Sequence, residues 1–113
     1  GPTHVAVLID QGARPALVAN LYLADNRLVV SAVNLPAVEA GKALELWLLP
    51  PAGAPPRSLG LLAKDRRRFE LASGYARALA TGALAVSLEP MGGSPTGLPT
   101  GPVLLHGAVL PAS

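Results

Sequence analysis

The class of fold is indicated most clearly by residues 42–49, which read KALELWLL. Leucine recurs at every second position, at Leu44, Leu46 and Leu48, and this is the period of a β-strand with one face against a core. Pro50 follows directly, with a second proline after it. Proline cannot donate to the hydrogen-bond ladder of a sheet, so we expect the strand to end at this point.

Short segments with the same alternation recur along the whole chain. We expect further strands at residues 4–10, 17–23, 28–33, 58–62, 67–71, 84–89 and 103–110. The first of these segments places Val5, Val7 and Ile9 on one face. Tight turns at residues 24–27 and 64–66 would each join two strands into a hairpin. Residues 75–80, between two glycines, could hold one or two helical turns.

Length and composition agree with this pattern. The 113 residues suffice for one domain, which we assign to residues 3–113, with Gly1 and Pro2 as a remnant of a cleaved expression tag. With 12 glycines and 12 prolines, the chain cannot form a helical bundle. Half of the residues are hydrophobic and only 14% are charged, which argues against disorder. The fold class predicted is all-β: an antiparallel β-sandwich of about seven to eight short strands, with at most one short helix.

The high mean hydropathy of +0.42 does not come from a membrane span. The longest stretch without acidic or basic residues, residues 90–113, contains five prolines and cannot be a lipid-exposed helix. The N-terminus does not read as a signal peptide, so we expect a soluble fragment of a longer protein.

Candidate catalytic or metal-binding residues are few. The chain has no cysteine, and its two histidines, His4 and His106, lack metal-binding spacing although the first and last strands could bring them together. Glu45 and Glu89 lie on the outer phase of their strands, where we expect them to be solvated. No serine lies in a G-x-S-x-G motif, which disfavours a hydrolase. We therefore predict no enzyme activity, no cofactor and no metal.

Two polar segments also favour structural roles. The Gly/Pro/Ser/Thr loop at residues 92–101 lacks the lysine and the following helix of a phosphate-binding loop, and indicates a stiff crossover between two strands. The basic run at residues 64–68 is expected at a hairpin tip, with Arg67 and Arg68 on opposite faces. The run contains an acid, and we expect no neighbouring aromatic platform beside it, so we predict no nucleic-acid partner.

Two aromatic side chains are candidates for a partner contact. Trp47 falls on the Glu45 side of its strand, where it either packs under a second layer or contacts a partner. Tyr22 lies on the outer phase of the segment at residues 17–23. These residues leave open an alternative function, a secreted carbohydrate- or partner-binding β-sandwich.

Three segments together resemble the C-terminal domain of the anti-sigma-K factor family. They are Leu44-Glu45-Leu46-Trp47-Leu48-Leu49-Pro50, Ser58-Leu59-Gly60-Leu61-Leu62, and Ala85-Val86-Ser87-Leu88-Glu89-Pro90 leading into a long loop. The family-motif loop comprises Gly92, Gly93, Ser94, Pro95, Thr96, Gly97, Pro99, Thr100, Gly101 and Pro102. The resemblance covers the chain from about Lys42 onward, and the segment before it agrees only in being strand-like.

The resemblance implies a regulatory role. Members of the family are single-pass bacterial membrane proteins whose cytoplasmic domain sequesters a sigma factor, and whose C-terminal domain lies on the periplasmic or outer side. Release of the sigma factor follows regulated proteolysis, which implies membrane proteases as further partners. The family supplies no catalytic residues to assign. Edge strands of a sandwich can pair with another copy, so the sequence leaves a homodimer open.

Overall fold

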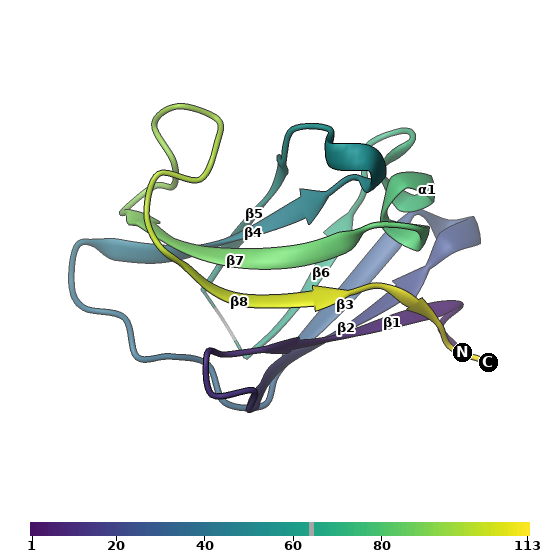
Figure 1. The fold of residues 1–113 in the computed structure, drawn as a ribbon, viewed down its shortest axis with the longest axis horizontal. Coiled ribbons are helices and arrows are strands. Elements are labelled where there is room, and N and C mark those ends of the chain that lie inside the picture. Colours follow the sequence, from purple (N-terminus) through teal and green to yellow (C-terminus); the bar gives the residue numbers. More distant parts are fainter. Residues whose placement is uncertain (64) are drawn as a thin grey trace.

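The computed structural model describes residues 1–63 and 65–113 (Figure 1). Within these two ranges the chain forms nine strands and one short α-helix, α1 (Tyr75–Ala80). The strands are β1 (His4–Ile9), β2 (Pro15–Tyr22), β3 (Arg27–Ala32), β4 (Lys42–Leu49), β5 (Arg57–Leu62), β6 (Arg66–Glu70), β7 (Ala83–Pro90), β8 (Val103–Ala108) and β9 (Leu110–Pro111). Two 3-10 turns, η1 (Leu23–Asp25) and η2 (Pro51–Gly53), follow β2 and β4. The predicted all-β class with one short helix is confirmed.

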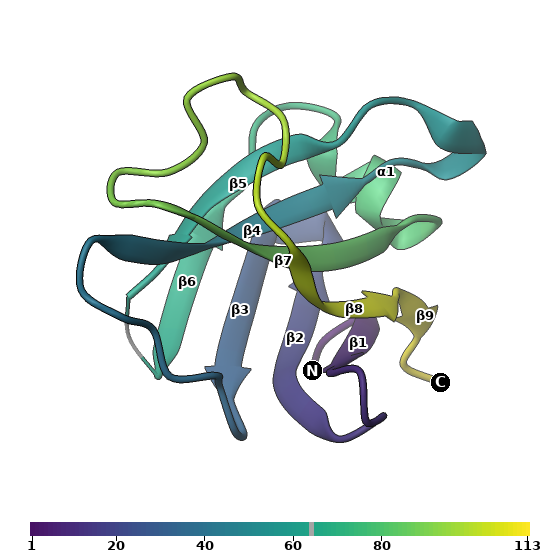
Figure 2. The same ribbon diagram turned by 60° about the vertical axis from the view of Figure 1, so that its left-hand side comes forward.

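All the strand pairs are antiparallel, and the order across the sheet is β5-β4-β7-β8-β1-β2-β3-β6, with β9 beside β1. The sheet curls into a barrel-like shape in which β5, β4, β7 and β8 face β1, β2, β3 and β6 (Figure 2). A single register pair between β8 and β1, Ile9 with His106, joins the two halves on one side. On the other side, no pairing joins β5 to β6 among the residues that the structure describes.

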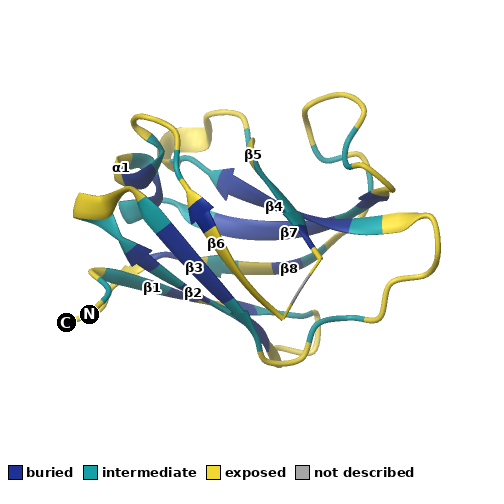
Figure 3. Ribbon diagram, turned by 180° about the vertical axis from the view of Figure 1, so that it is seen from behind, coloured by how far each residue is buried: buried dark blue, intermediate teal, exposed yellow. Residues whose placement is uncertain are grey.

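The core lies between the two halves, and the buried residues of the strands that enclose it are dark blue in Figure 3. Leu44, Leu46 and Leu48 of β4 are 3% exposed or less, as the alternation at residues 42–49 predicted. They meet alternate residues of β2, including Leu17 and Leu21, in one continuous cluster. Burying each leucine stabilises the fold by about 1.5–3 kcal/mol. The helix α1 contacts β2, β4 and η1, and so covers one end of this core.

The buried face of β1 differs from the expectation. Val5, Val7 and Ile9 share one face, as the alternation predicts, but the face toward the core is that of Ala6 and Leu8, and Val7 is 45% exposed. Both phases of this strand are apolar, so a period of two does not determine which of them faces the core.

The second predicted hairpin is wrong in its pairing. Strands form close to the expected residues 58–62 and 67–71, but β5 pairs with β4 and β6 pairs with β3. The predicted turn includes Lys64, which lies outside the described residues. Alternation predicts that a segment is extended. Which strand it pairs with depends on contacts with strands elsewhere in the sequence, which alternation does not encode.

The two chain ends lie side by side. The strand β9 pairs with β1, and the amide of Ala112 donates to the carbonyl of Thr3 at 3.0 Å. Figures 1 and 3 show both ends at one extremity of the molecule, with the loop between β7 and β8 toward the opposite extremity.

Candidate functional site

The outer face of β4 and β7 carries a buried polar layer. Glu45 is 6% exposed, Glu89 is 1% exposed, and Trp47 and Ser87 are fully buried. The expectation that both glutamates are solvated is therefore wrong. The loop at residues 91–102 returns to the outer face of these strands and supplies the polar groups that bond Glu45 and Glu89. Strand alternation distinguishes the two faces of a sheet, but it does not predict what covers the outer one.

Glu89 bonds the end of this loop. Its Oε2 accepts hydrogen bonds from Ser87 Oγ at 2.6 Å, from the Thr100 amide at 3.1 Å and from the Gly101 amide at 3.2 Å. Its Oε1 accepts from Thr100 Oγ1. Burial by itself would raise the pKa of Glu89, but these hydrogen bonds outweigh it and hold the pKa below its ordinary value. The Trp47 indole donates to Ser87 Oγ at 2.8 Å, which links the loop to the buried aromatic ring.

Glu45 bonds the beginning of the same loop. Its Oε1 accepts from the Ser94 amide at 2.7 Å, and its Oε2 accepts from Ser58 Oγ of β5 at 2.5 Å. The two glutamates therefore attach the family-motif loop at both ends, to β4 and to β7. Among the described residues, no buried side-chain nitrogen or oxygen lacks a hydrogen-bond partner.

This arrangement suits attachment better than proton transfer. All four carboxylate oxygens accept hydrogen bonds from the protein itself. A general acid would need a raised pKa, and the pKa of Glu89 is lowered. The two carboxylates therefore serve to hold the loop in place.

The loop exposes apolar side chains around its attachment points. Met91 is 77% exposed, Leu98 at the tip is 47% exposed, and Val103 at the start of β8 is 46% exposed. Within the tip, Ser94 Oγ donates to the carbonyl of Leu98, and Thr96 Oγ1 donates to the same carbonyl at 3.1 Å. The tip is thus ordered by its own hydroxyl groups while its apolar side chains meet solvent.

Trp47 and Tyr22 lie on the outer faces of opposite halves of the barrel. Trp47 on β4 is fully buried, so it packs beneath the second layer that the sequence left open. Tyr22 ends β2 and is half-buried. A partner contact at these two residues stays a prediction, and Tyr22 is the one with accessible side-chain surface.

The two histidines lie near opposite ends of β1, because His4 is its first residue and His106 of β8 pairs with its last residue. His4 pairs with Leu21 and Pro111, whereas His106 pairs with Ile9 and Ala85. Five residues of strand separate the two positions, which corresponds to about 16 Å. In the part of the chain that the structure describes, no three His, Asp or Glu side chains gather closely enough to hold a metal ion.

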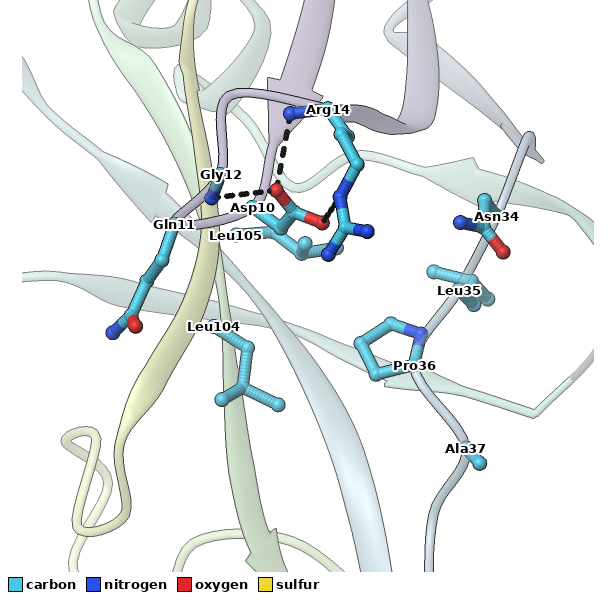
Figure 4. A pocket seen from close by; sticks show the side chains of 10 residues that line it. All are labelled: Asp10, Gln11, Gly12, Arg14, Asn34, Leu35, Pro36, Ala37, Leu104 and Leu105. Carbon is cyan, nitrogen blue, oxygen red and sulfur yellow. Dashed lines mark hydrogen bonds and ion pairs between the residues drawn. The ribbon is translucent and has the colours of Figure 1, made fainter.

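A cavity that the sequence did not reveal lies beside the turn between β1 and β2 (Figure 4). It has a volume of about 560 Å³ and is lined in part by Arg14, Leu35, Pro36 and Leu104. Asp10 shapes its wall by accepting bonds from the Gly12 amide at 2.9 Å, the Arg14 amide at 3.0 Å and Arg14 Nε at 3.0 Å. The signal in the sequence that could have revealed it is an Asp-x-Gly turn with an arginine two residues later.

The charge of Asp10 is favoured in this setting. The Arg14 amide first, and then the Arg14 guanidinium and the Gly12 amide, hold the pKa of Asp10 below its ordinary value. The Arg14 side chain remains 75% exposed at the rim and is oriented by the contact of its Nε with Asp10 Oδ2 at 3.0 Å. The cavity therefore combines an apolar wall with one oriented guanidinium.

The basic run includes a stacked arginine. The guanidinium carbon of Arg67 lies 4.2 Å from the centre of the Phe69 ring, and Arg67 Nη1 donates to the carbonyl of Leu61 on β5. Residues 67 and 69 share one face of β6, which places the ring beneath the arginine. Phe69 is only 4% exposed, so it supports Arg67, and the prediction of no nucleic-acid partner stays a prediction.

Fold and site together define a small all-β domain in which buried carboxylates attach a long loop to a barrel-like sheet. Comparison with protein-family models adds a match, over residues 1–103, to the family described as "Anti-sigma-K factor rskA, C-terminal". The chain belongs to this family. The match extends to the N-terminal strands, beyond the region from Lys42 onward that carried the sequence resemblance.

This membership defines the chain as an anti-sigma factor domain, from a family that is regulatory and acts on a sigma factor. Searches of the curated proteins and of the solved structures found no match. Within the described residues, no helix is both long enough and apolar enough to cross a membrane.

Proposed function

We propose that this domain lies on the outer side of the membrane in a single-pass anti-sigma factor and controls when the sigma factor is released. The observation that carries the proposal is the family match over residues 1–103. A separate cytoplasmic domain of the parent protein would hold the sigma factor. Membrane proteases would then free it by cutting the parent chain.

In this proposal residues 3–113 act as one unit without catalytic activity, and Gly1 and Pro2 belong to an expression tag. The single core supports one unit, because it runs from Ala6 near the start to Val109 near the end. The arrangement of the two carboxylates supports a non-catalytic role, since Glu45 and Glu89 use their oxygens to hold the loop.

The position of the chain ends suggests how such a domain would face its surroundings. Both ends lie at one extremity and the family-motif loop lies at the other (Figure 1). An anchor joined to either end would therefore leave the loop pointing away from the membrane. The exposed apolar side chains Met91, Leu98 and Val103 would then be available to an external partner.

Control of proteolysis requires that the parent protein has two states, in which proteases reach the segment next to this domain to different extents. A stable barrel beside the membrane would shield the adjoining segment of the parent chain. A partner that binds one state more tightly would shift the balance between them.

The test removes residues 3–113 from the full-length parent protein and measures both the half-life of the parent and transcription from a sigma-dependent promoter. Loss of shielding should shorten the half-life and raise transcription. The matched control replaces the domain with an unrelated folded domain of similar size, which separates steric bulk from specific regulation. If the deletion changes neither quantity, the domain does not control release.

A further inference from the structure

The sheet has two free edges that face each other. In the described ranges β5 pairs only with β4 and β6 pairs only with β3, so each presents one unpaired row of backbone groups. A cavity of about 270 Å³ lies between them, lined in part by Leu59 of β5, Phe69 of β6 and Tyr75. The barrel is therefore open along one side, at a place wide enough to hold side chains.

The hydrogen bonds to β3 show which backbone groups of β6 point outward. The Ala32 amide donates to the carbonyl of Asp65, and the Leu71 amide donates to the carbonyl of Asn26. In an antiparallel pair the bonded residues alternate, so the odd-numbered residues of β6 face β3. Arg66, Arg68 and Glu70 consequently direct their amides and carbonyls to the free edge.

The facing edge, on β5, already accepts a hydrogen bond from a side chain where the amide of a further strand would donate. Arg67 reaches across from β6 and donates to the carbonyl of Leu61, while its guanidinium rests on Phe69. The Arg67 side chain lies directly against Gly60, because a Cβ at that position would be in van der Waals contact, at 3.4 Å, with both terminal nitrogens of Arg67. One arginine thus fills part of the place that a further strand would occupy.

The side chains along the open side are strongly basic. Arg57, Arg66, Arg67 and Arg68 are all exposed. The single acidic residue of β6, Glu70, is paired with Arg27 of β3 at 3.3 Å. Arg66 and Arg68 share the outer face of β6, two residues apart, which is the spacing of alternate side chains on an added strand.

We propose that the edge of β6 binds an extended acidic segment of a partner protein as an additional β-strand. Acidic side chains at every second position of the segment would lie opposite Arg66 and Arg68 on the outer face. Its intervening apolar side chains would point toward the cavity beside Phe69. An amide of the segment would replace Arg67 at the carbonyl of Leu61. A second copy of this chain does not fit, because its own arginines would be placed against these.

Strand binding at the edge of β6 depends only on the folded chain and not on where the domain lies in the cell. The test uses the whole chain and a fluorescent peptide of about eight residues that alternates glutamate and valine, followed by anisotropy. One comparison peptide alternates lysine and valine. Another has the composition of the first with its glutamates in one block. The alternating glutamate peptide should bind at least about tenfold more tightly than either.

Charge-reversal variants locate the site. The double substitution R66E/R68E should weaken binding of the alternating glutamate peptide by at least about tenfold, because two attractions become repulsions. The matched control R14E/R77E makes the same change of net charge away from this edge, at the turn between β1 and β2 and on α1, and should leave binding within about twofold. Equal weakening in both variants would mean that the peptide senses only overall charge, and would overturn the proposal.

Hydrogen exchange distinguishes strand addition from a contact between side chains. The peptide should slow amide exchange at Arg66, Arg68 and Glu70, since those amides become hydrogen-bonded. Unchanged exchange at these amides, or equal binding of the two glutamate peptides, would exclude an added strand. Binding to vesicles of anionic lipid that is lost in R66E/R68E, without binding of the peptide, would assign the arginines to a membrane surface and overturn the proposal.

Discussion

Glu89 illustrates how a single side chain can organise a surface. Its carboxylate is 1% exposed and accepts bonds from Ser87, Thr100 and Gly101. A charged hydrogen bond of this kind contributes about 1.5–3 kcal/mol, and leaving buried donors without an acceptor costs a similar amount. The charge of this residue and the position of the loop are therefore linked.

The first prediction concerns pH. Because the pKa of Glu89 is lower in the folded state than its ordinary value of 4.5, the charged form stabilises the fold above that value, and the stabilisation is lost as pH falls through the folded pKa. We expect E89Q to lower the free energy of unfolding at neutral pH by about 1–3 kcal/mol. The difference between E89Q and the parent chain should shrink as pH falls from about 7 to about 3.

Urea unfolding at each pH measures this difference, and E39Q, a change at an exposed acid, is the control. Trp47 is the sole tryptophan, is fully buried and is linked to Glu89 through Ser87, so its fluorescence reports the same event. Quenching by acrylamide should increase in E89Q and not in E39Q. An E89Q difference that stays constant with pH would contradict the role assigned to the charge.

Prediction from sequence failed for this layer for a physical reason. The alternation around Glu45 and Glu89 correctly separates the inner face from the outer face. The burial of both residues depends on Ser94 and Thr100 returning from a loop, which no period in the sequence encodes. A glutamate on an outer face is solvated unless a remote segment covers it.

At the scale of elements, the loop between β7 and β8 is held very close to the strand that precedes it. A Cβ added at Gly101 would overlap the carbonyl oxygen of Leu88, whereas one added at Gly97 meets nothing within 4 Å. The loop thus has one end with no space for a side chain and a tip that is open.

The second prediction compares alanine substitutions at these two glycines. G101A should lower the free energy of unfolding by about 3 kcal/mol or more, since the clash is with backbone and the Glu89 contacts must shift. G97A has a positive φ of 81° but free space, so it should cost about 1 kcal/mol. Thermal unfolding followed by circular dichroism measures both variants. Equal losses would indicate that the loop is not held against β7.

Local signals were sufficient for elements with clear ends. The expected strand at residues 42–49 and helix at residues 75–80 match the bounds of β4 and α1, because Pro50 ends the first and glycines flank the second. The pairing of β5 and β6 was beyond such signals. Each strand adds to a different half of the barrel, and this choice is made by neighbours remote in sequence.

At the scale of the whole molecule, the chain follows a circuit. It starts in β1 and crosses to the β4 half of the sheet. It then returns to β6, crosses again to β7 and β8, and ends in β9 beside the strand where it began. Of the eight strand pairs among the described residues, four join strands that are not consecutive: β1 with β8, β1 with β9, β3 with β6 and β4 with β7. These remote pairs are why the sequence predicted an antiparallel all-β fold but not the order of its strands.

The two chain ends are close enough to be joined, so the chain can be reopened at another place. The last prediction is a circular permutant in which a short Gly/Ser linker joins Ser113 to Gly1 and new ends are opened at Gly97. The amide of Ala112 already bonds the carbonyl of Thr3, so the linker closes only a small gap. After the cut, Glu45 still holds Ser94 on one side and Glu89 still holds Thr100 on the other.

The permutant should give the same circular dichroism spectrum and a cooperative thermal transition. A second permutant opened at Gly101, where the backbone contacts Leu88, is the matched comparison and should be clearly less stable. An unfolded Gly97 permutant would show that the closed loop itself is required. If it folds, the barrel does not require the native order of the strands along the chain. Glu45 and Glu89 then each hold one part of the loop independently of the other.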